Sequence, residues 1–186
     1  SMLDIFSLCH NWIDNMKSVR CLSRSLRNHA HISWLYLNHC DLGSTPEILS
    51  VILQSNISII NLEHNNIDSF GAVTIAEYLE SDPPICQIDL DNNRFNDNDA
   101  ILISHALKKN TNLKTIFLHT NNLTAIGVKA LLTCVFDSSS LNAISESNHT
   151  LGGMNMFLKG NNDTNGSLAD CIDKLLELDR IDKIVL

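Results

Sequence analysis

The chain is poor in several residue types that characterise other classes of protein. Aromatic residues make up 5% and charged residues 18% of its 186 residues, and it contains only three prolines and seven glycines. Apolar residues nonetheless reach 44%, which is enough for a single domain with a continuous core. With so few aromatic residues available, we expect that core to be built from aliphatic side chains.

Positive charge is also scarce. The sequence has 13 lysines and arginines against 21 aspartates and glutamates, a net charge of −8. Association with nucleic acid or with anionic membranes draws on positive charge, so this balance argues against both kinds of partner. No apolar run approaches the roughly 20 residues needed to cross a bilayer. We therefore expect neither a nucleic acid nor a membrane as the partner.

The cysteines show no metal-binding pattern. None of them forms a CxxC pair, and they are too scattered for a compact zinc module, so we interpret them as reduced core thiols. We expect no metal ion and no cofactor. The five N-x-S/T sequons are interpreted as chance matches in an asparagine-rich chain, and the sequence therefore favours an intracellular, cytoplasmic location. The six cysteines are Cys9, Cys21, Cys40, Cys86, Cys134 and Cys171.

One pattern recurs five times along the sequence. Apolar residues stand at its first, fourth, sixth and eleventh positions, and a small polar residue usually stands at the ninth. The alternation at positions four to six has the period of a short strand, and the segment that follows repeats apolar residues at a helical spacing. Each unit is therefore predicted to form a strand, a turn and a helix. The units begin at Ile32, Ile57, Ile85, Leu113 and Leu141, which are 25, 28, 28 and 28 residues apart.

Stacked units of this kind predict an α/β solenoid shaped as a horseshoe, with short parallel strands on the concave face and helices on the convex face. We expect one domain over residues 1–186. Residues 1–31 are interpreted as a helical N-terminal cap and a half repeat, and residues 32–151 as five repeat strands with intervening helices. Residues 152–186 are interpreted as a loop, a helix and a sixth edge strand, through which two copies can pair edge to edge.

The segment from Ile57 to Asn112 resembles the ribonuclease-inhibitor type of leucine-rich repeat, whose unit reads LxxLxLxxNxL and then a helix. In that family the ninth-position asparagine turns inward and hydrogen-bonds to neighbouring turns, which satisfies backbone groups that would otherwise be buried and unpaired. The resemblance implies this role, a structural asparagine ladder, for Asn65, Asn93 and Asn121.

The first and fifth units depart from the pattern. Cys40 and His149 replace the ladder asparagine, and Glu146 replaces an inward leucine. An unpaired buried carboxylate would cost several kcal/mol, so we expect an irregular or bulged strand in the fifth unit.

Side chains at positions three, five, seven and eight are expected to point out of the concave sheet. Trp34, Tyr36, Ile59 and Phe117 then have no core to fill and resemble anchors for a partner. The alternative is that Trp34 covers the N-terminal cap and Phe117 shields a neighbouring strand. Acidic residues between the anchors favour a partner with basic and apolar side chains. The predicted partner-binding residues are Trp34, Tyr36, Ile59, Asn61, Glu63, Asp89, Asp91, Phe117 and His119.

Nothing in the sequence supplies a nucleophile elbow, a phosphate loop or a paired general acid and base. We therefore predict a non-catalytic module that binds an unidentified protein partner. One alternative is a regulator that inhibits a hydrolase or activates a GTPase, because Ran GTPase-activating proteins look like this repeat class; Arg94 is then the residue nominated for charge stabilisation. Another is a structural fragment of a longer receptor. A metal site at His39, His64 and His119 is disfavoured relative to solvated side chains.

Overall fold

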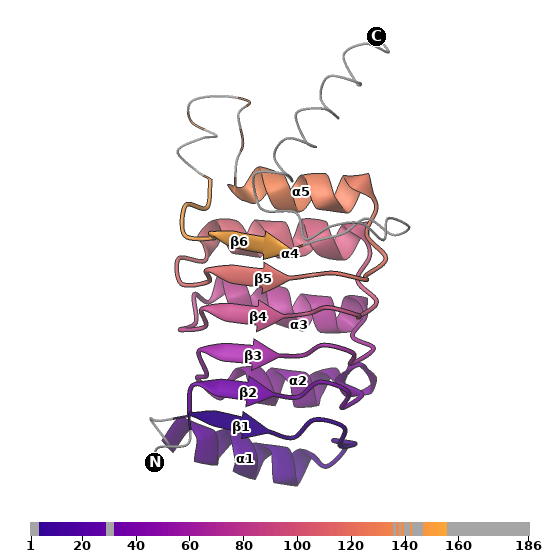
Figure 1. The fold of residues 1–186 in the computed structure, drawn as a ribbon, viewed down its shortest axis with the longest axis vertical. Helices are drawn as coiled ribbons and strands as arrows, with labels where there is room; N and C mark the ends of the chain where they lie inside the picture. The colour runs from indigo at the N-terminus through magenta and orange to yellow at the C-terminus, as the bar shows by residue number, and fades with distance from the viewer. Residues whose placement is uncertain are drawn as a thin grey trace.

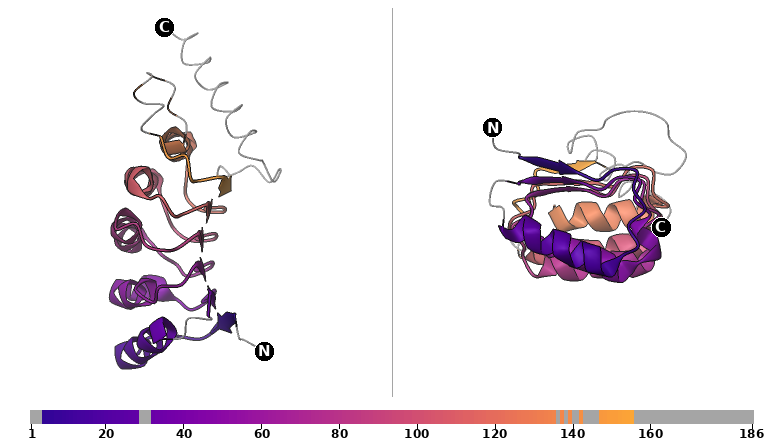
Figure 2. Two further views of the ribbon diagram at one scale, coloured as in Figure 1. Left: turned by 90° about the vertical axis from the view of Figure 1, so that its left-hand side faces the viewer. Right: turned by 90° about the horizontal axis from the view of Figure 1, so that it is seen from below.

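The computed structural model describes residues 4–28, 32–135 and 147–155, together with the single residues 137, 139 and 142. These residues form two layers (Figures 1 and 2). Six short strands make one parallel sheet in chain order, and the helices all cover the same side of it. We call the other side the open sheet face.

Each helix follows one strand and leads back to the next. The strands are β1 (Ile5–Ser7), β2 (Trp34–Tyr36), β3 (Ile59–Asn61), β4 (Gln87–Asp89), β5 (Thr115–Phe117) and β6 (Gly153–Asn155). The helices are α1 (Met16–Asn28), α2 (Pro46–Leu53), α3 (Ser69–Glu80), α4 (Asp97–Lys109) and α5 (Ala125–Val135), with a short 3-10 helix, η1 (Leu42–Ser44), before α2. The predicted α/β leucine-rich-repeat architecture is confirmed.

The core is aliphatic and lies between the two layers. In the units that begin at Ile57, Ile85 and Leu113, the side chains at positions one, four, six and eleven are at most 1% exposed. The helices contribute buried residues such as Ile75 and Ile103 on their sheet-facing sides. Each fully buried aliphatic side chain contributes about 1.5–3 kcal/mol, so the periodic apolar positions account for the pairing of sheet and helices.

Helix α4 begins with a capping box. The side chain of Asn96 accepts hydrogen bonds from the amides of Asn98 and Asp99, while the Asp99 carboxylate accepts one from the Asn96 amide. The next residue, Asp97, accepts from the amides of Thr124 and Gly127 at the start of α5. The first turn of one helix therefore also orients the next helix.

The three asparagines Asn65, Asn93 and Asn121 are buried in the turns after β3, β4 and β5. The Asn93 amide nitrogen donates to the carbonyls of Leu62 and Leu90, both at 3.0 Å, and its Oδ1 accepts from the Ile67 amide at 2.9 Å. Asn65 and Asn121 make corresponding bonds in their own units. Each side chain thus joins its turn to the turn of the preceding unit.

The unit that begins at Ile32 has a thiol at the ninth position. Cys40 is 1% exposed, and its Sγ donates to the carbonyl oxygen of Leu8 at 3.1 Å. In the next unit, the side-chain amide of Asn65 donates to the carbonyl of Leu37. Leu37 occupies the same position in its unit as Leu8 does in the unit before. Burial raises the pKa of the Cys40 thiol, so the group stays protonated and able to donate.

The interpretation of the cysteines as core thiols holds for only part of the set. Cys40 and Cys134 are buried, Cys9 and Cys86 are partly buried, and Cys21 is exposed on α1. Cys171 lies outside the described residues. Within the described part of the chain, no helix combines the length and apolar character needed to cross a membrane.

The predicted helical cap at the N-terminus is wrong. Residues 5–7 form strand β1, which pairs with β2 so that Phe6 stands opposite Leu35 at the fourth position. With this register, the sequence contains a further unit before the one at Ile32, with apolar residues and an asparagine at every expected place. It is the first unit of the structure, and the unit at Ile32 is the second. Closely spaced apolar residues on both sides of the strand hid the alternation and suggested a helix. The five places are filled by Leu3, Phe6, Leu8, Asn11 and Ile13.

The predicted position of the fifth repeat strand is also wrong. Strand β6 pairs with β5 so that Met154, rather than Ile144, stands opposite Ile116 at the fourth position. The unit therefore begins at Leu151, not at Leu141. Ile144 and Glu146 lie outside the described residues, as do the helix and sixth strand expected after residue 155.

The displaced unit has a physical cause in Asn148. Asn148 is the eighth residue of the unit predicted to begin at Leu141, a position expected to point out of the sheet. It is instead 4% exposed: its Oδ1 accepts from the Leu151 amide at 2.9 Å, and its side-chain amide donates to the Asn110 carbonyl at 2.9 Å. Asn110 makes the same bond to the amide of Leu113, the first residue of the preceding unit. A buried asparagine three residues before the first position of the unit thus sets where each of these two units starts.

Replacement of a ladder asparagine tests the contribution of these bonds. Asn93→Ala is expected to lower the free energy of unfolding by about 1–3 kcal/mol, because buried carbonyl and amide groups lose their partner. Chemical denaturation followed by circular dichroism measures the loss. The matched control is Asn98→Ala, an exposed asparagine in the first turn of α4, which should change stability much less. Equal losses in the two variants would contradict the buried ladder.

Candidate binding surface

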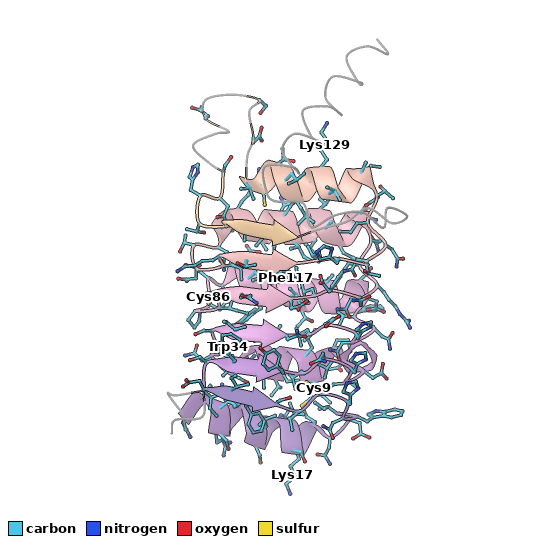
Figure 3. All side chains as sticks on the ribbon, in the orientation of Figure 1. Cys9, Lys17, Trp34, Cys86, Phe117 and Lys129 are labelled. Atoms are coloured by element: carbon cyan, nitrogen blue, oxygen red, sulfur yellow. The ribbon has the colours of Figure 1, made fainter. Side chains whose placement is uncertain are left out.

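The sheet register determines which side chains line the open sheet face. Trp34, Ile59, Gln87 and Thr115 stand side by side across β2 to β5, and Tyr36, Asn61, Asp89 and Phe117 form the next row. The residues between these rows are fully buried, and side chains alternate along a strand, so both rows point away from the helices. Figure 3 shows Trp34 and Phe117 on this face.

The apolar members of this surface are less exposed than expected. Trp34 is 38% exposed, whereas Tyr36, Ile59 and Phe117 are partly buried. Neighbouring strands lie only about 4.8 Å apart, so each side chain shields the next. The rings of Trp34 and Tyr36 meet edge to face, with 6.2 Å between their centroids. These side chains are supported by contacts from one side and present the other to solvent.

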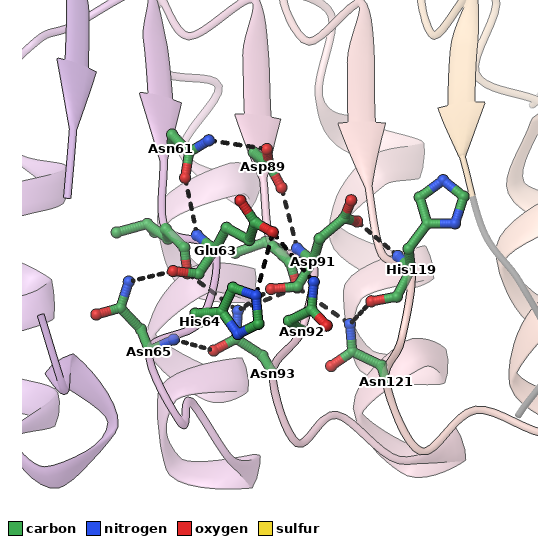
Figure 4. A network of polar contacts seen from close by, with 12 residues as sticks. Asn61, Glu63, His64, Asn65, Asp89, Asp91, Asn92, Asn93, His119 and Asn121 are labelled. Carbon is green, nitrogen blue, oxygen red and sulfur yellow. Dashed lines mark hydrogen bonds and ion pairs between the residues drawn. The ribbon is translucent and has the colours of Figure 1, made fainter. Parts of the chain in front are cut away.

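A hydrogen-bonded acidic network occupies the middle of the face (Figure 4). The Asn61 side chain donates to Asp89 Oδ2 at 2.9 Å and accepts from the Glu63 amide at 2.9 Å. Asp89 Oδ1 accepts from the Asp91 amide at 3.0 Å, and Asp91 Oδ1 accepts from the His119 amide at 2.6 Å. Five of the predicted partner-binding residues therefore belong to one connected group, in which backbone amides hold the carboxylates of Asp89 and Asp91.

The crowding of carboxylates changes their protonation. Burial and then the charge of Asp89 raise the pKa of Asp91 to about 7, although the bond from the His119 amide opposes this. Burial, together with the charge of Glu63, also raises the pKa of Asp89, against the bond from the Asp91 amide. Around neutral pH part of the Asp91 population therefore holds a proton that a nearby cation would displace.

Three histidines form a stacked column beside the network. His10, His39 and His64 occupy the eighth position of successive units, each with a positive φ between 54° and 59°. The ring centroids of His10 and His39 are 4.4 Å apart, and those of His39 and His64 are 4.3 Å apart, with nearly parallel planes. Burial, then the charges of the two neighbours, lowers the pKa of His39. Its neutral form is therefore favoured.

One member of this surface, His10, was not expected from the sequence. His10 was missed because its unit was interpreted as a cap, and the recurrence of histidine at the eighth position is the signal that would have found it. Asn92, expected to point outward at the eighth position of the unit that begins at Ile85, donates to Glu63 Oε1 at 3.1 Å. His119 precedes the eighth position by one residue and lies on the acidic network, not in the histidine column.

The structure supports neither the histidine metal site nor a charge-stabilising site at Arg94. Among the described residues, no group of three or more histidines, cysteines, aspartates or glutamates is placed to hold a metal ion. Arg94, nominated for charge stabilisation in a GTPase activator, is exposed, and its guanidinium donates to Asn66 Oδ1 at 3.1 Å. Its contacts are those of a residue that links two neighbouring turns.

Comparison with known proteins supports the fold. No protein-family model and no curated protein sequence matches the chain. Among solved structures, leiomodin-1 actin-binding site 2 superposes with a TM-score of 0.60 and 17% identity, covering 92% of this chain and 97% of that one. The tropomodulin C-terminal domain of Caenorhabditis elegans gives a TM-score of 0.58 at 11% identity, covering 90% and 99%. The chain is thus similar in fold to these leucine-rich-repeat-like domains.

These matches correct the resemblance to the ribonuclease-inhibitor type. The two solved structures reported above are leiomodin and tropomodulin domains, and not ribonuclease-inhibitor-type proteins. The physical reason is that the LxxLxLxxNxL pattern describes one strand, its turn and the start of a helix. Any solenoid with that unit geometry needs the same buried positions, so the pattern identifies the unit and does not distinguish the families that use it.

The raised pKa of Asp91 predicts the pH dependence of stability. The folded state keeps the Asp91 proton to higher pH than the unfolded state, so ionisation of this group lowers stability as pH rises from about 4 to about 7. Asp91→Asn removes this effect while retaining an acceptor for the His119 amide. We expect it to stabilise the protein at pH 8 by about 1–2 kcal/mol, a value reduced for solvent screening, and to have no such effect at pH 4.

Urea denaturation of both proteins across this pH range measures the difference. Asp97→Asn is the control, because hydrogen bonds from Thr124 and Gly127 outweigh burial and lower the pKa of Asp97. The ionised form of Asp97 stabilises the fold, so this variant should be less stable than the wild type at neutral pH. The difference should shrink as pH falls below about 4, where Asp97 of the wild type becomes protonated. If Asp91→Asn stabilised the protein equally at pH 4 and at pH 8, the result would be inconsistent with a raised pKa of Asp91.

Proposed function

We propose that this chain is a non-catalytic protein-binding module that uses its open sheet face. The observation that carries the proposal is the acidic network of Asn61, Glu63, Asp89 and Asp91, which is held in place by backbone amides and flanked by partly exposed aromatic side chains. A surface that is already ordered loses little conformational freedom on binding. It therefore suits recognition of another folded surface.

The chemistry of the face indicates the kind of partner. Carboxylates that repel one another in the free protein are stabilised when a lysine or arginine side chain lies among them. Trp34 and Tyr36 on one side, and Phe117 on the other, offer apolar contact at the edges of this acidic centre. The face therefore favours a partner that places a basic side chain between apolar ones.

Actin is the first partner to test. The similar leiomodin-1 domain is an actin-binding site, and it superposes on 92% of the present chain. The proposal is that this chain, like that domain, binds a protein. A further part of the proposal is an intracellular location, supported by the protonated Cys40 thiol, which donates a hydrogen bond inside the core.

Paired variants test whether the open sheet face is the binding surface. Tyr36→Ala combined with Phe117→Ala is expected to weaken binding at least tenfold, because aromatic anchors contribute more than about 1 kcal/mol each. The control is Phe70→Ala combined with Ile126→Ala, which removes apolar groups that are 74% and 65% exposed on the helices. The control should bind as well as the wild type, and both variants should keep a melting temperature close to that of the wild type.

Binding is measured by co-sedimentation with actin filaments and by titration of labelled actin monomers. If neither form of actin binds, affinity capture from lysate with the same variants identifies the partner. Undiminished binding by Tyr36→Ala with Phe117→Ala, or loss of binding in the control variant alone, would show that the open sheet face is not the binding surface.

A further inference from the structure

At the N-terminal end of the solenoid, apolar positions that are fully buried in the following units remain partly exposed to solvent. Phe6, Leu8 and Ile13, at positions four, six and eleven of the first unit, are only partly buried. The residues at the same positions of the next unit are at most 1% exposed: Leu35, Leu37 and Leu42. The second unit is covered by the first, whereas no described residue covers the first.

These side chains line a groove of about 380 Å³ at the end of the stack. It lies between β1, the loop that follows it, and α1, and Trp12 stands beside it with 78% of its surface exposed. In Figure 1 this end carries the indigo elements β1 and α1. Removal of such apolar surface from water is favourable, so the groove offers a contact to a complementary apolar segment. Its apolar lining consists of Phe6, Leu8, Trp12, Ile13, Val19 and Leu22.

Strand β1 also has a free edge. The amides of Leu8 and His10 donate to carbonyls of the β2 segment, at 2.9 and 3.0 Å. Backbone groups alternate in direction along a strand, so those of Ile5 and Ser7 point to the opposite edge, where the described residues supply no partner strand. An edge of this kind accepts an additional strand.

The hydrogen bonds of Asn11 indicate how a segment added beside β1 would be oriented. Its side-chain amide donates to Leu8 and Cys9 of its own turn, at 2.9 and 3.1 Å, as the ladder asparagines do in theirs. In Asn93, Oδ1 also accepts from amides of the preceding turn. Asn11 is exposed, and among the described residues its Oδ1 accepts no hydrogen bond. That acceptor fits a turn of a parallel unit, whereas a second copy related by a twofold axis would pair with β1 in antiparallel fashion.

We propose that the N-terminal end of the solenoid, formed by β1, α1 and the loop between them, is a second docking site, separate from the open sheet face. Its occupant is a leucine-rich strand–turn–helix unit of a partner polypeptide. The partner adds a strand parallel to β1, fills the groove with its apolar residues at positions four, six and eleven, and donates turn amides to Asn11. The contact repeats the interface that already joins each pair of neighbouring units in this chain.

Trp12 reports on occupation of this site. The chain has two tryptophans, so Trp34→Phe leaves Trp12 as the only indole. The probe is a 28-residue peptide that copies residues 57–84 of this chain, and the control peptide carries serine at the places of Ile60, Leu62 and Ile67. Titration with the probe is expected to give a saturable blue shift of Trp12 emission, because the indole passes from water into an apolar contact. The control peptide is expected to give none.

Variants in the Trp34→Phe background locate the contact. Asn11→Ala is expected to weaken binding of the probe several-fold, and Leu22→Glu to abolish it, with circular dichroism confirming that both proteins are folded. Ile126→Glu, on the exposed side of α5, is the matched control and should bind as before. Tyr36→Ala with Phe117→Ala should also bind as before, so failure of the proposed function and failure of this site are distinguishable.

Three results would overturn the proposal. They are the absence of any shift at millimolar probe, equal shifts with the probe and the control peptide, and binding that is unaffected by both Asn11→Ala and Leu22→Glu. A blue shift that grows with protein concentration alone, together with a dimer in sedimentation equilibrium, would replace the partner unit by a second copy of this chain.

Discussion

The hydrogen bonds that inward-turned side chains make between consecutive turns are the constraint on which the rest of this structure depends. Asn65, Asn93 and Asn121 satisfy buried carbonyls and amides that no strand or helix pairs, and they do so across unit boundaries. Each unit is thereby placed at one spacing from the last. Cys40 continues the series with a weaker donor, and Asn110 and Asn148 provide a corresponding link where the chain enters a strand.

This regular spacing produces the chemistry of the open sheet face. Residues 25 to 29 apart in sequence become neighbours about one strand spacing apart, so similar side chains at the same position of successive units are brought together. Three imidazoles stack, and the Asp89 and Asp91 carboxylates share one network with Glu63. The shifted pKa values follow from this proximity and from partial burial. Like charges held this close repel one another, and a group of opposite charge among them would relieve that repulsion.

The same constraint explains which sequence-based expectations were right. The central units, from Ile57 to Phe117, follow the pattern closely, and their strands, buried positions and outward rows could be predicted residue by residue. The first unit was missed because Ile5 and Trp12, on exposed sides, interrupt the apolar alternation of Phe6, Leu8 and Ile13. The last described strand was misplaced because the buried side chain of Asn148 outweighs a weak local match at Ile144.

The sequence by itself determined the periodic unit, the alternation that separates buried from outward residues, and the aliphatic nature of the core. These depend on local geometry, which has a fixed period in strands and helices. Only the tertiary structure decided that His10, His39 and His64 stack, that Asp91 retains its proton to about neutral pH, and that the first unit leaves an open groove. Each of these depends on the distance and burial of groups from different units, and a linear pattern does not contain that information.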